Sequence, residues 1–305
     1  MTAASRAFAP LDLLQIVAVA TIWGVNNVAA KVALFSFPPL MTVAMRFAIV
    51  LIALAPWIKA PPRQGLPLLL PMLLCVGPLH FGIQYFGLYL ARDLAPMVVA
   101  MQLWAPASVV FAALVLGERV GALRWAGVAL AFLGAASMNF DPAVFAQWAP
   151  LALVAGAACM YGLGAALVRK IGAGPNPWVM QTWIALLSAP TMIAASATLE
   201  HGQLEAMRSA PWYAWACVAF GAIVSSIVAN AFMFRLVQRY EVSRTTPYLL
   251  LSPVISFALA AFVLGDHITA RIIAGAAATL AGVVLVALAE GRFRALAPAK
   301  IEPAT

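Results

Sequence analysis

The sequence predicts an all-α membrane protein, with ten transmembrane helices in two inverted five-helix repeats around a central cavity. Three observations lead to this fold class: the composition, the spacing of apolar runs and an internal repeat. Of the 305 residues, 65% are hydrophobic and only 9% are charged, and the mean hydropathy is +0.98. Soluble domains are about one-quarter charged, so a soluble or disordered chain is excluded. A β-barrel would alternate polar and apolar residues instead of running apolar throughout.

Charged residues, prolines and glycines divide the chain into apolar runs close to the roughly 20 residues that cross a bilayer as a helix. The predicted spans are 11–32, 39–58, 67–89, 95–116, 124–140, 148–169, 177–198, 210–236, 245–264 and 270–289. The first run is long enough to span, so we expect it to remain as a helix and not to be removed as a signal peptide. The connections are too short for a soluble domain.

The basic residues predict the orientation. If the N-terminus is cytoplasmic, most of the 18 Lys and Arg residues fall in cytoplasmic loops or tails. Only Lys31, Arg92, Arg208 and Arg271 fall on the other side, and Arg46 lies inside a span. Because cytoplasmic loops are enriched in Lys and Arg, both termini are predicted on the cytoplasmic side of the membrane. The formal net charge of +8 then follows from topology and requires no nucleic-acid partner.

Short motifs recur between the two halves of the chain. Leu116-Gly117-Glu118 ends the fourth span and Leu264-Gly265-Asp266 ends the ninth. Each half contains an odd number of spans, so the halves must point in opposite directions, as in many secondary transporters. We therefore expect a first repeat over 1–141, a second over 142–290 and a basic cytoplasmic tail over 291–305.

Several motifs, in this order, resemble the drug/metabolite transporter superfamily in its ten-helix EamA branch. They are Ile22-Trp23-Gly24-Val25-Asn26 followed by Lys31, then Pro38-Pro39-Leu40-Met41, Arg46-Phe47, Leu116-Gly117-Glu118-Arg119, Arg239-Tyr240-Glu241, Pro247, Pro253 and Leu264-Gly265-Asp266. The resemblance implies a basket of ten helices around a central cavity. It also implies export of amino acids and related metabolites, as in the aromatic amino-acid and cysteine/O-acetylserine exporters. Asp266-His267 departs from the family, which often has Glu-Arg there.

Polar and aromatic residues within the spans are the candidate substrate contacts, because polar groups at membrane depth usually face the bundle interior. The predicted substrate-binding residues are His80, Trp104, Gln84, Trp23, Asn27, Trp183, Tyr248, Tyr85 and Ser252. Aromatic faces with neutral hydrogen-bonding groups suit a zwitterion with an apolar side chain, whereas a multiply charged substrate would need several Arg or Lys. The alternative is structural, since Asn side chains tie helices together and Ser hydroxyls bond to their own helix.

His80 is the sharpest single candidate, because it is the only histidine within a predicted span. All Asp and Glu residues lie in loops, tails or span ends. If transport is coupled to protons, His80 is therefore the main candidate for the proton site. Facilitated diffusion down a metabolite gradient is the simpler alternative.

Four further residues are candidates for gating. Pro106 and Pro253 occupy similar places in the two halves and are predicted hinges, although a static kink is the alternative. Lys31 and Arg46 are predicted on the outer side, near an exit gate. Arg46 either extends to the interface or binds a substrate carboxylate.

The function predicted from the sequence is secondary transport, namely export of neutral or aromatic amino acids or related metabolites across a bacterial-type inner membrane by alternating access. A drug or nucleoside exporter is the alternative; a channel or an intramembrane enzyme is less favoured, since no Gly-x-Ser-x-Gly or His-Glu-x-x-His motif occurs. No catalytic residue, cofactor or metal site is predicted, and Cys75, Cys159 and Cys217 have no paired spacing. The expected partners are a small-molecule substrate and membrane lipid, with the chain acting as a monomer.

Overall fold

The described part of the chain is entirely helical. The computed structural model describes residues 9–60, 66–117, 120–137, 147–171, 176–239, 249 and 251–296, and no strand occurs among them. The helices are α1 (Pro10–Ala33), α2 (Pro39–Leu54), η1 (Ala55–Trp57), α3 (Leu66–Val76), α4 (Pro78–Leu90), α5 (Ala95–Met101), α6 (Trp104–Leu116), α7 (Ala122–Ser137), α9 (Trp148–Ile171), α10 (Pro177–Leu199), α11 (Gln203–Ser209), α12 (Trp212–Ala219), η3 (Phe220–Ala229), α13 (Asn230–Arg239), α15 (Leu251–Leu259), η4 (Ala260–Leu264) and α16 (Ala270–Leu296).

Seven helical segments of the described chain are long and apolar enough to cross a membrane. They are Pro10–Ala33, Pro39–Trp57, Pro67–Leu90, Ala95–Leu116, Trp148–Val168, Trp178–Leu199 and Trp212–Met233. Three shorter apolar helices cover Ala122–Ser137, Leu251–Leu264 and Ala270–Val286. Large apolar side chains on the outside, such as Phe262 at 90% exposure and Leu114 at 74%, fit a lipid-facing surface. The fold is that of a multi-pass helical membrane protein.

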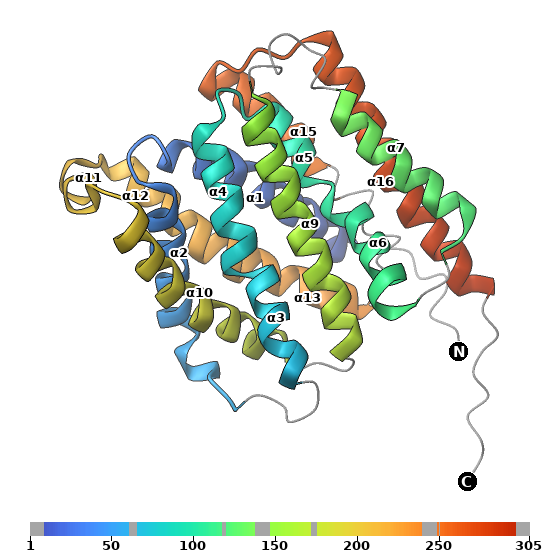
Figure 1. Ribbon diagram of the computed structural model, residues 1–305, viewed down its shortest axis with the longest axis horizontal. Coiled ribbons are helices and arrows are strands. Elements are labelled where there is room, and N and C mark those ends of the chain that lie inside the picture. The colour runs from blue at the N-terminus through green and yellow to red at the C-terminus, as the bar shows by residue number, and fades with distance from the viewer. Residues whose placement is uncertain are drawn as a thin grey trace.

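The two halves interleave. Helix α1 packs against η3, α13 and α15 of the second half, while α9, the first helix of that half, packs against α3, α4 and α6 of the first. Figure 1 shows α9 lying across these three helices. Two further pairs join equivalent helices of the halves, α2 with α10 and α7 with α16. Exchanging the halves maps this packing onto itself, which fits the repeat expected from the sequence.

The α7–α16 pair, side by side at one edge of Figure 1, brings the backbones of the two halves close together. A Cβ on Gly134 would lie 2.5 Å from Thr279 N, and a Cβ on Gly127 would lie 2.9 Å from Gly282 O. Glycine is therefore required at both positions, because only its backbone can approach this closely. Gly117 and Gly265, which the sequence repeat pairs, end α6 and η4 with φ of +66° and +73°.

Candidate functional site

Three spans lose α-helical regularity in the interior of the bundle. One span breaks at Gly77, between α3 and α4, and another breaks at Gln102–Leu103, between α5 and α6. Prolines account for both breaks, since Pro78 and Pro106 lack the N–H that would bond four residues back. The third span changes to a ten-residue π-helix, η3. Such irregular segments often mark functional sites in membrane proteins.

Arg46, on α2, is the buried cation of this region, with only 5% of its surface exposed. Its Nη1 donates to Tyr85 Oη at 2.7 Å and to Asn26 Oδ1 at 3.4 Å. Its Nε and Nη2 donate to Ser226 Oγ at 3.1 and 3.0 Å. The guanidinium also lies over the ring of Phe81, 5.1 Å from its centroid. All these partners are uncharged, and no carboxylate pairs with Arg46 in the described ranges.

The π-helix places Ser226 beside the guanidinium. Ser226 Oγ donates to Gly221 O at 3.1 Å, five residues back, so its lone pairs are left to accept from Arg46. A Cβ on Gly221 would lie 3.1 Å from Asn26 Oδ1 and 3.4 Å from Arg46 Nη1. Glycine at this position therefore lets the π-helix backbone come close to the cation.

His80, one turn into α4, joins the first half to α9. Its Nδ1 lies 2.8 Å from Ala157 O, and because a carbonyl only accepts, Nδ1 carries the hydrogen. The His80 ring centroid lies 4.7 Å from that of Phe81 and 4.9 Å from that of Tyr161. Trp104 meets Tyr161 edge-on at 5.7 Å. Phe81 therefore links the Arg46 group to a second group of His80, Tyr161 and Trp104.

Gln84 follows His80 by one turn on α4. Its Nε2 lies 3.5 Å from Met101 Sδ, at the α5–α6 break, while its buried Oε1 has no hydrogen-bond partner among the described residues. A buried carbonyl oxygen without a donor is costly unless a ligand or water supplies one. The oxygen is thus an unused acceptor close to His80.

Asn27 and Ser256 fasten α1 to α15, while Ser252 contributes only a backbone carbonyl within α15. Asn27 Nδ2 donates to Ser256 Oγ at 3.0 Å, and Ser256 Oγ lies 3.0 Å from both Gly24 O and Ser252 O. Trp23 is half-buried one turn before Asn27. These contacts match the helix-tying alternative, and they do not join the Arg46 and His80 groups.

The other predicted contacts lie elsewhere. Trp183 Nε1 donates to Lys59 O at 2.9 Å, and its ring packs in an apolar cluster with α3, away from Arg46. Tyr248 lies outside the described residues. Pro253 lies in α15, four residues after the helical residue Leu249, and Pro106 directly follows the break at Gln102–Leu103.

Lys31 and the carboxylates of Asp266 and Glu200 lie at one end of the bundle, which we call the carboxylate end. Lys31 Nζ donates to Leu88 O at 2.7 Å and to Ala91 O, the last carbonyls of α4. Asp266 Oδ2 accepts from the backbone N–H groups of Leu94 at 2.5 Å and Ala95 at 2.8 Å. Burial raises the pKa of Asp266, while these N–H groups oppose the rise.

Glu200 plays the corresponding part at α2. Its two carboxylate oxygens accept from Leu40 N at 2.7 Å and Met41 N at 3.0 Å, and Oε2 also accepts from Ser196 Oγ at 2.7 Å. Gln203, on the exposed helix α11, donates to the carbonyls of Ser196 and Glu200. This helix falls in a stretch that the sequence predicts as a loop; it follows Gly202, whose φ of +76° starts it.

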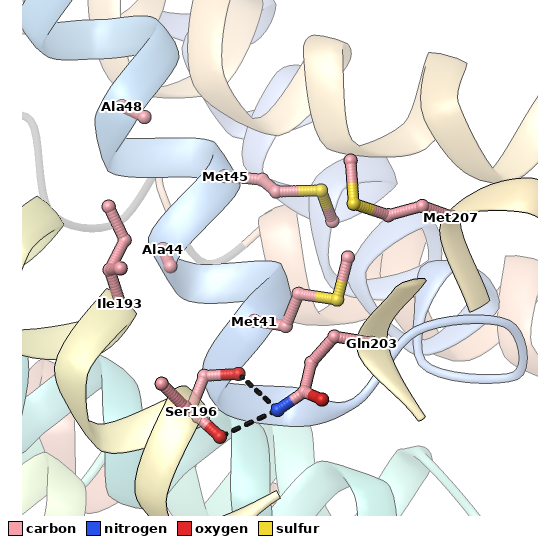
Figure 2. A pocket seen from close by; sticks show the side chains of 9 residues that line it. Met41, Ala44, Met45, Ala48, Ile193, Ser196, Gln203 and Met207 are labelled. Carbon is pink, nitrogen blue, oxygen red and sulfur yellow. Dashed lines mark hydrogen bonds between the residues drawn. The ribbon is translucent and has the colours of Figure 1, made fainter. Parts of the chain in front are cut away.

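A groove of 460 Å³ lies beside Glu200, between α2, α10 and α11 (Figure 2). It is lined by Met41, Ala44, Met45, Ala48, Ile193, Ser196, Ala197, Gln203 and Met207. In Figure 2, Met45 and Met207 point toward one another, and Gln203 bonds to Ser196 at the groove's base. The sequence gives only a weak sign of it, two methionines four residues apart on one helix face.

The chain is similar to known transport proteins. It is 28% identical over 277 residues to a protein of Salmonella typhimurium named "Probable amino-acid metabolite efflux pump", covering 88% of this chain and 91% of that one. The protein of the same name in Escherichia coli is 28% identical over 274 residues, with the same coverage. The "Uncharacterized transporter YvbV" of Bacillus subtilis is 27% identical, covering 87% of each chain.

Structural similarity agrees with these matches. A solved crystal structure that is 19% identical superposes with a TM-score of 0.60, covering 94% of this chain and 99% of the other, which shows a shared fold. Residues 11–140 and 148–288 each match the EamA-like transporter family. The resemblance inferred from the motifs is thus confirmed, and this chain, with two copies of the family domain, belongs to the EamA-like transporter family.

Proposed function

We propose that this protein is a secondary transporter that exports neutral amino acids, aromatic ones included, and related small metabolites across the inner membrane. The observation that carries the proposal is the buried, charge-unpaired guanidinium of Arg46 joined through Phe81 to the ring of His80. The names of the two efflux-pump relatives support export of this class.

The chemistry of the site favours a zwitterion with an apolar side chain. Arg46 supplies one positive charge, the unpaired Oε1 of Gln84 is an acceptor for an ammonium group, and Tyr161 and Trp104 offer aromatic faces. A lipophilic cation would require a buried anion in the site. The buried ion of this site is Arg46, which is positively charged and would repel a cation. Drug cations are therefore the weaker candidate.

We propose that transport proceeds by alternating access between the two repeats, over 1–141 and 142–290, with both termini cytoplasmic. The contacts of His80 with Ala157 and Tyr161 cross from one repeat to the other, so a ligand there meets both. Pro106 is the proposed hinge of the first repeat and Pro253 that of the second. One chain supplies both repeats, so a monomer is sufficient.

The proposed test is uptake of labelled amino acids into proteoliposomes, with and without a pH gradient, for the parent, His80→Ala and the matched control His201→Ala. His201 is exposed and lies between α10 and α11, so its replacement should leave uptake unchanged. Saturable, stereoselective uptake that His80→Ala weakens supports the proposal. Gradient-driven uptake that becomes uncoupled only in His80→Ala would make His80 the proton site; gradient-independent uptake supports facilitated diffusion.

Two results would overturn the proposal. Absence of uptake for every amino acid, with the protein folded, would favour the drug or nucleoside readings. Unsaturable uptake without stereoselectivity would favour a channel.

A further inference from the structure

We propose that Arg46 and Tyr85 together form a carboxylate-binding site, which makes a free carboxylate the obligatory feature of the substrate. The inference rests on the proposed transport function and deepens it, because it names the two residues that select the substrate class. It excludes amides and amines that carry the same side chain.

The first support is the charge balance around Arg46. The side chain is 95% buried, as its 5% exposure shows, yet its partners are two hydroxyls and one amide oxygen. Leaving a buried ion without a counter-ion is expensive, and buried ions are normally paired. Lys31, equally buried, shows the usual solution, since Asp266 and Asp93 interact with it electrostatically. In the described part of the chain, Arg46 has no such partner, and a substrate anion fills that role.

The second support is the set of unused donors. A guanidinium carries five N–H groups. The hydrogen bonds that Arg46 donates engage one N–H at Nε, two at Nη1 and one at Nη2, which leaves one N–H on Nη2. The Nη1 contact with Asn26, at 3.4 Å, is the longest and the most easily exchanged.

Tyr85 supplies the other unused donor. Arg46 has no acceptor, so Tyr85 Oη accepts from it, and the phenolic hydrogen has no acceptor among the described residues. Tyr85 is only 3% exposed, so water from outside the bundle does not reach it freely. A guanidinium N–H and a phenol O–H that both point at one anion form charge-assisted hydrogen bonds, the stronger class.

The surroundings fix the direction from which the carboxylate approaches. Ser226 accepts hydrogen bonds at one edge of the guanidinium, the backbone of Gly221 lies close by, and Phe81 covers its face. Phe81 also contacts the His80 ring, so a substrate bound by its carboxylate at Arg46 extends its side chain toward His80. The site therefore binds the carboxylate end of the substrate by charge and the side-chain end by aromatic contact.

The test compares acid and amide ligands on the purified full-length chain. Thermal unfolding in detergent is measured with L-phenylalanine, L-phenylalaninamide, benzoate and benzamide for the parent, Arg46→Lys, Arg46→Gln, Tyr85→Phe and the exposed-arginine control Arg208→Gln. The same acids and amides compete with labelled L-phenylalanine in the proteoliposome assay. We expect the acids to bind at least about tenfold more tightly than the amides, as befits a bond to a charged group.

The variants separate this site from a general effect on folding. Arg46→Gln should remove the preference for acid, Arg46→Lys should retain part of it, and Tyr85→Phe should weaken acid binding while leaving amide binding unchanged. Arg208→Gln should keep the full preference. If Arg46→Gln does not fold, Arg46→Lys and Tyr85→Phe still decide the question.

The outcomes for the site and for the transport function are distinct. Equal binding of acid and amide by the parent, or an acid preference that survives in Arg46→Gln, overturns the carboxylate site whatever is transported. Acid-specific stabilisation that depends on Arg46, in a protein that transports no amino acid, upholds the site and overturns the proposed function.

Discussion

Two buried cations, Lys31 and Arg46, are equally hidden from solvent but differ in what surrounds them. Lys31 donates to Leu88 O and Ala91 O, at the C-terminal end of α4, and interacts with Asp93 and Asp266 at the carboxylate end. Arg46 has only hydroxyl and amide partners around its guanidinium. A cation at a helix C-terminus is stabilised by the terminal carbonyls and the helix dipole, whereas Arg46 has no comparable source of negative charge among the described residues.

The difference separates a structural site from a binding site. At the carboxylate end, Glu200 and Asp266 each accept two backbone N–H groups from the start of another helix. Those groups would otherwise have no partner, so the carboxylates hold helices of the two repeats together. In the Arg46 region, by contrast, the described residues supply no anion to pair with the guanidinium. We expect stability to depend on the first region and transport on the second.

The largest expected effect is on transport, from Arg46→Met. Loss of a hydrogen-bonded charge should lower kcat/KM for amino-acid uptake by at least about tenfold, or about 1.5–3 kcal/mol. The unfolding temperature should change little, because an unpaired buried cation is removed along with its bonds. Uptake kinetics and thermal unfolding of the same preparation give both quantities. A large drop in stability with unchanged kcat/KM would contradict this expectation and would make Arg46 a structural residue.

The next effect is on stability, from Glu200→Ala. Two N–H groups at the start of α2 and the hydroxyl of Ser196 lose their acceptor, which should cost about 1–3 kcal/mol. Thermal unfolding of the full chain measures the loss. Glu200→Gln retains an acceptor oxygen and should be affected less, and uptake by the folded fraction should keep its KM. A raised KM in Glu200→Ala would show that the carboxylate end also shapes the binding site.

The smallest effect concerns pH. Burial raises the pKa of Asp266 above that of an unfolded aspartate, which is about 4. A group with a raised pKa in the folded state contributes stability at low pH, and this contribution is lost as the pH rises through the raised value. The unfolding temperature of the parent should therefore fall, relative to Asp266→Asn, between pH 4 and pH 7. Identical pH profiles for the two proteins would contradict this reading.

The sequence predicted the helical segments well because their signal is local. Each predicted range is mostly helical where the structure describes it, with interruptions at Gly77 and Gln102–Leu103, since charges, prolines and glycines bound the apolar runs. The sequence also contains a signal for the two helix breaks, because Pro78 and Pro106 lack the N–H that an unbroken helix needs. The α11 helix was missed because its seven residues, which follow a glycine, carry no apolar periodicity.

The candidate site was less predictable because its contacts join distant parts of the chain. His80, Gln84, Tyr85 and Trp104 were expected from polarity within a span, and they lie near the breaks. The partner of Arg46 on η3 is 180 residues away, and no local pattern indicates that pairing. Ser hydroxyls within spans were expected to bond to their own helix; Ser226 does so and also accepts from Arg46. Trp183 was a candidate by depth, but its indole turns to Lys59 O, a direction that only tertiary packing sets.

The π-helix η3 has a consequence for the register of its span. A π-helix holds more residues in each turn than an α-helix, and one residue of an α-helix corresponds to a rotation of about 100°. The segment thus behaves as an insertion that the span has absorbed, at the point where Gly221 and Ser226 meet Arg46. Deleting one residue from Phe220–Ala229 would restore α geometry and rotate α13 relative to α12. The contact of Ser226 with the guanidinium therefore depends on the backbone register of η3, which the deletion of a single residue would change.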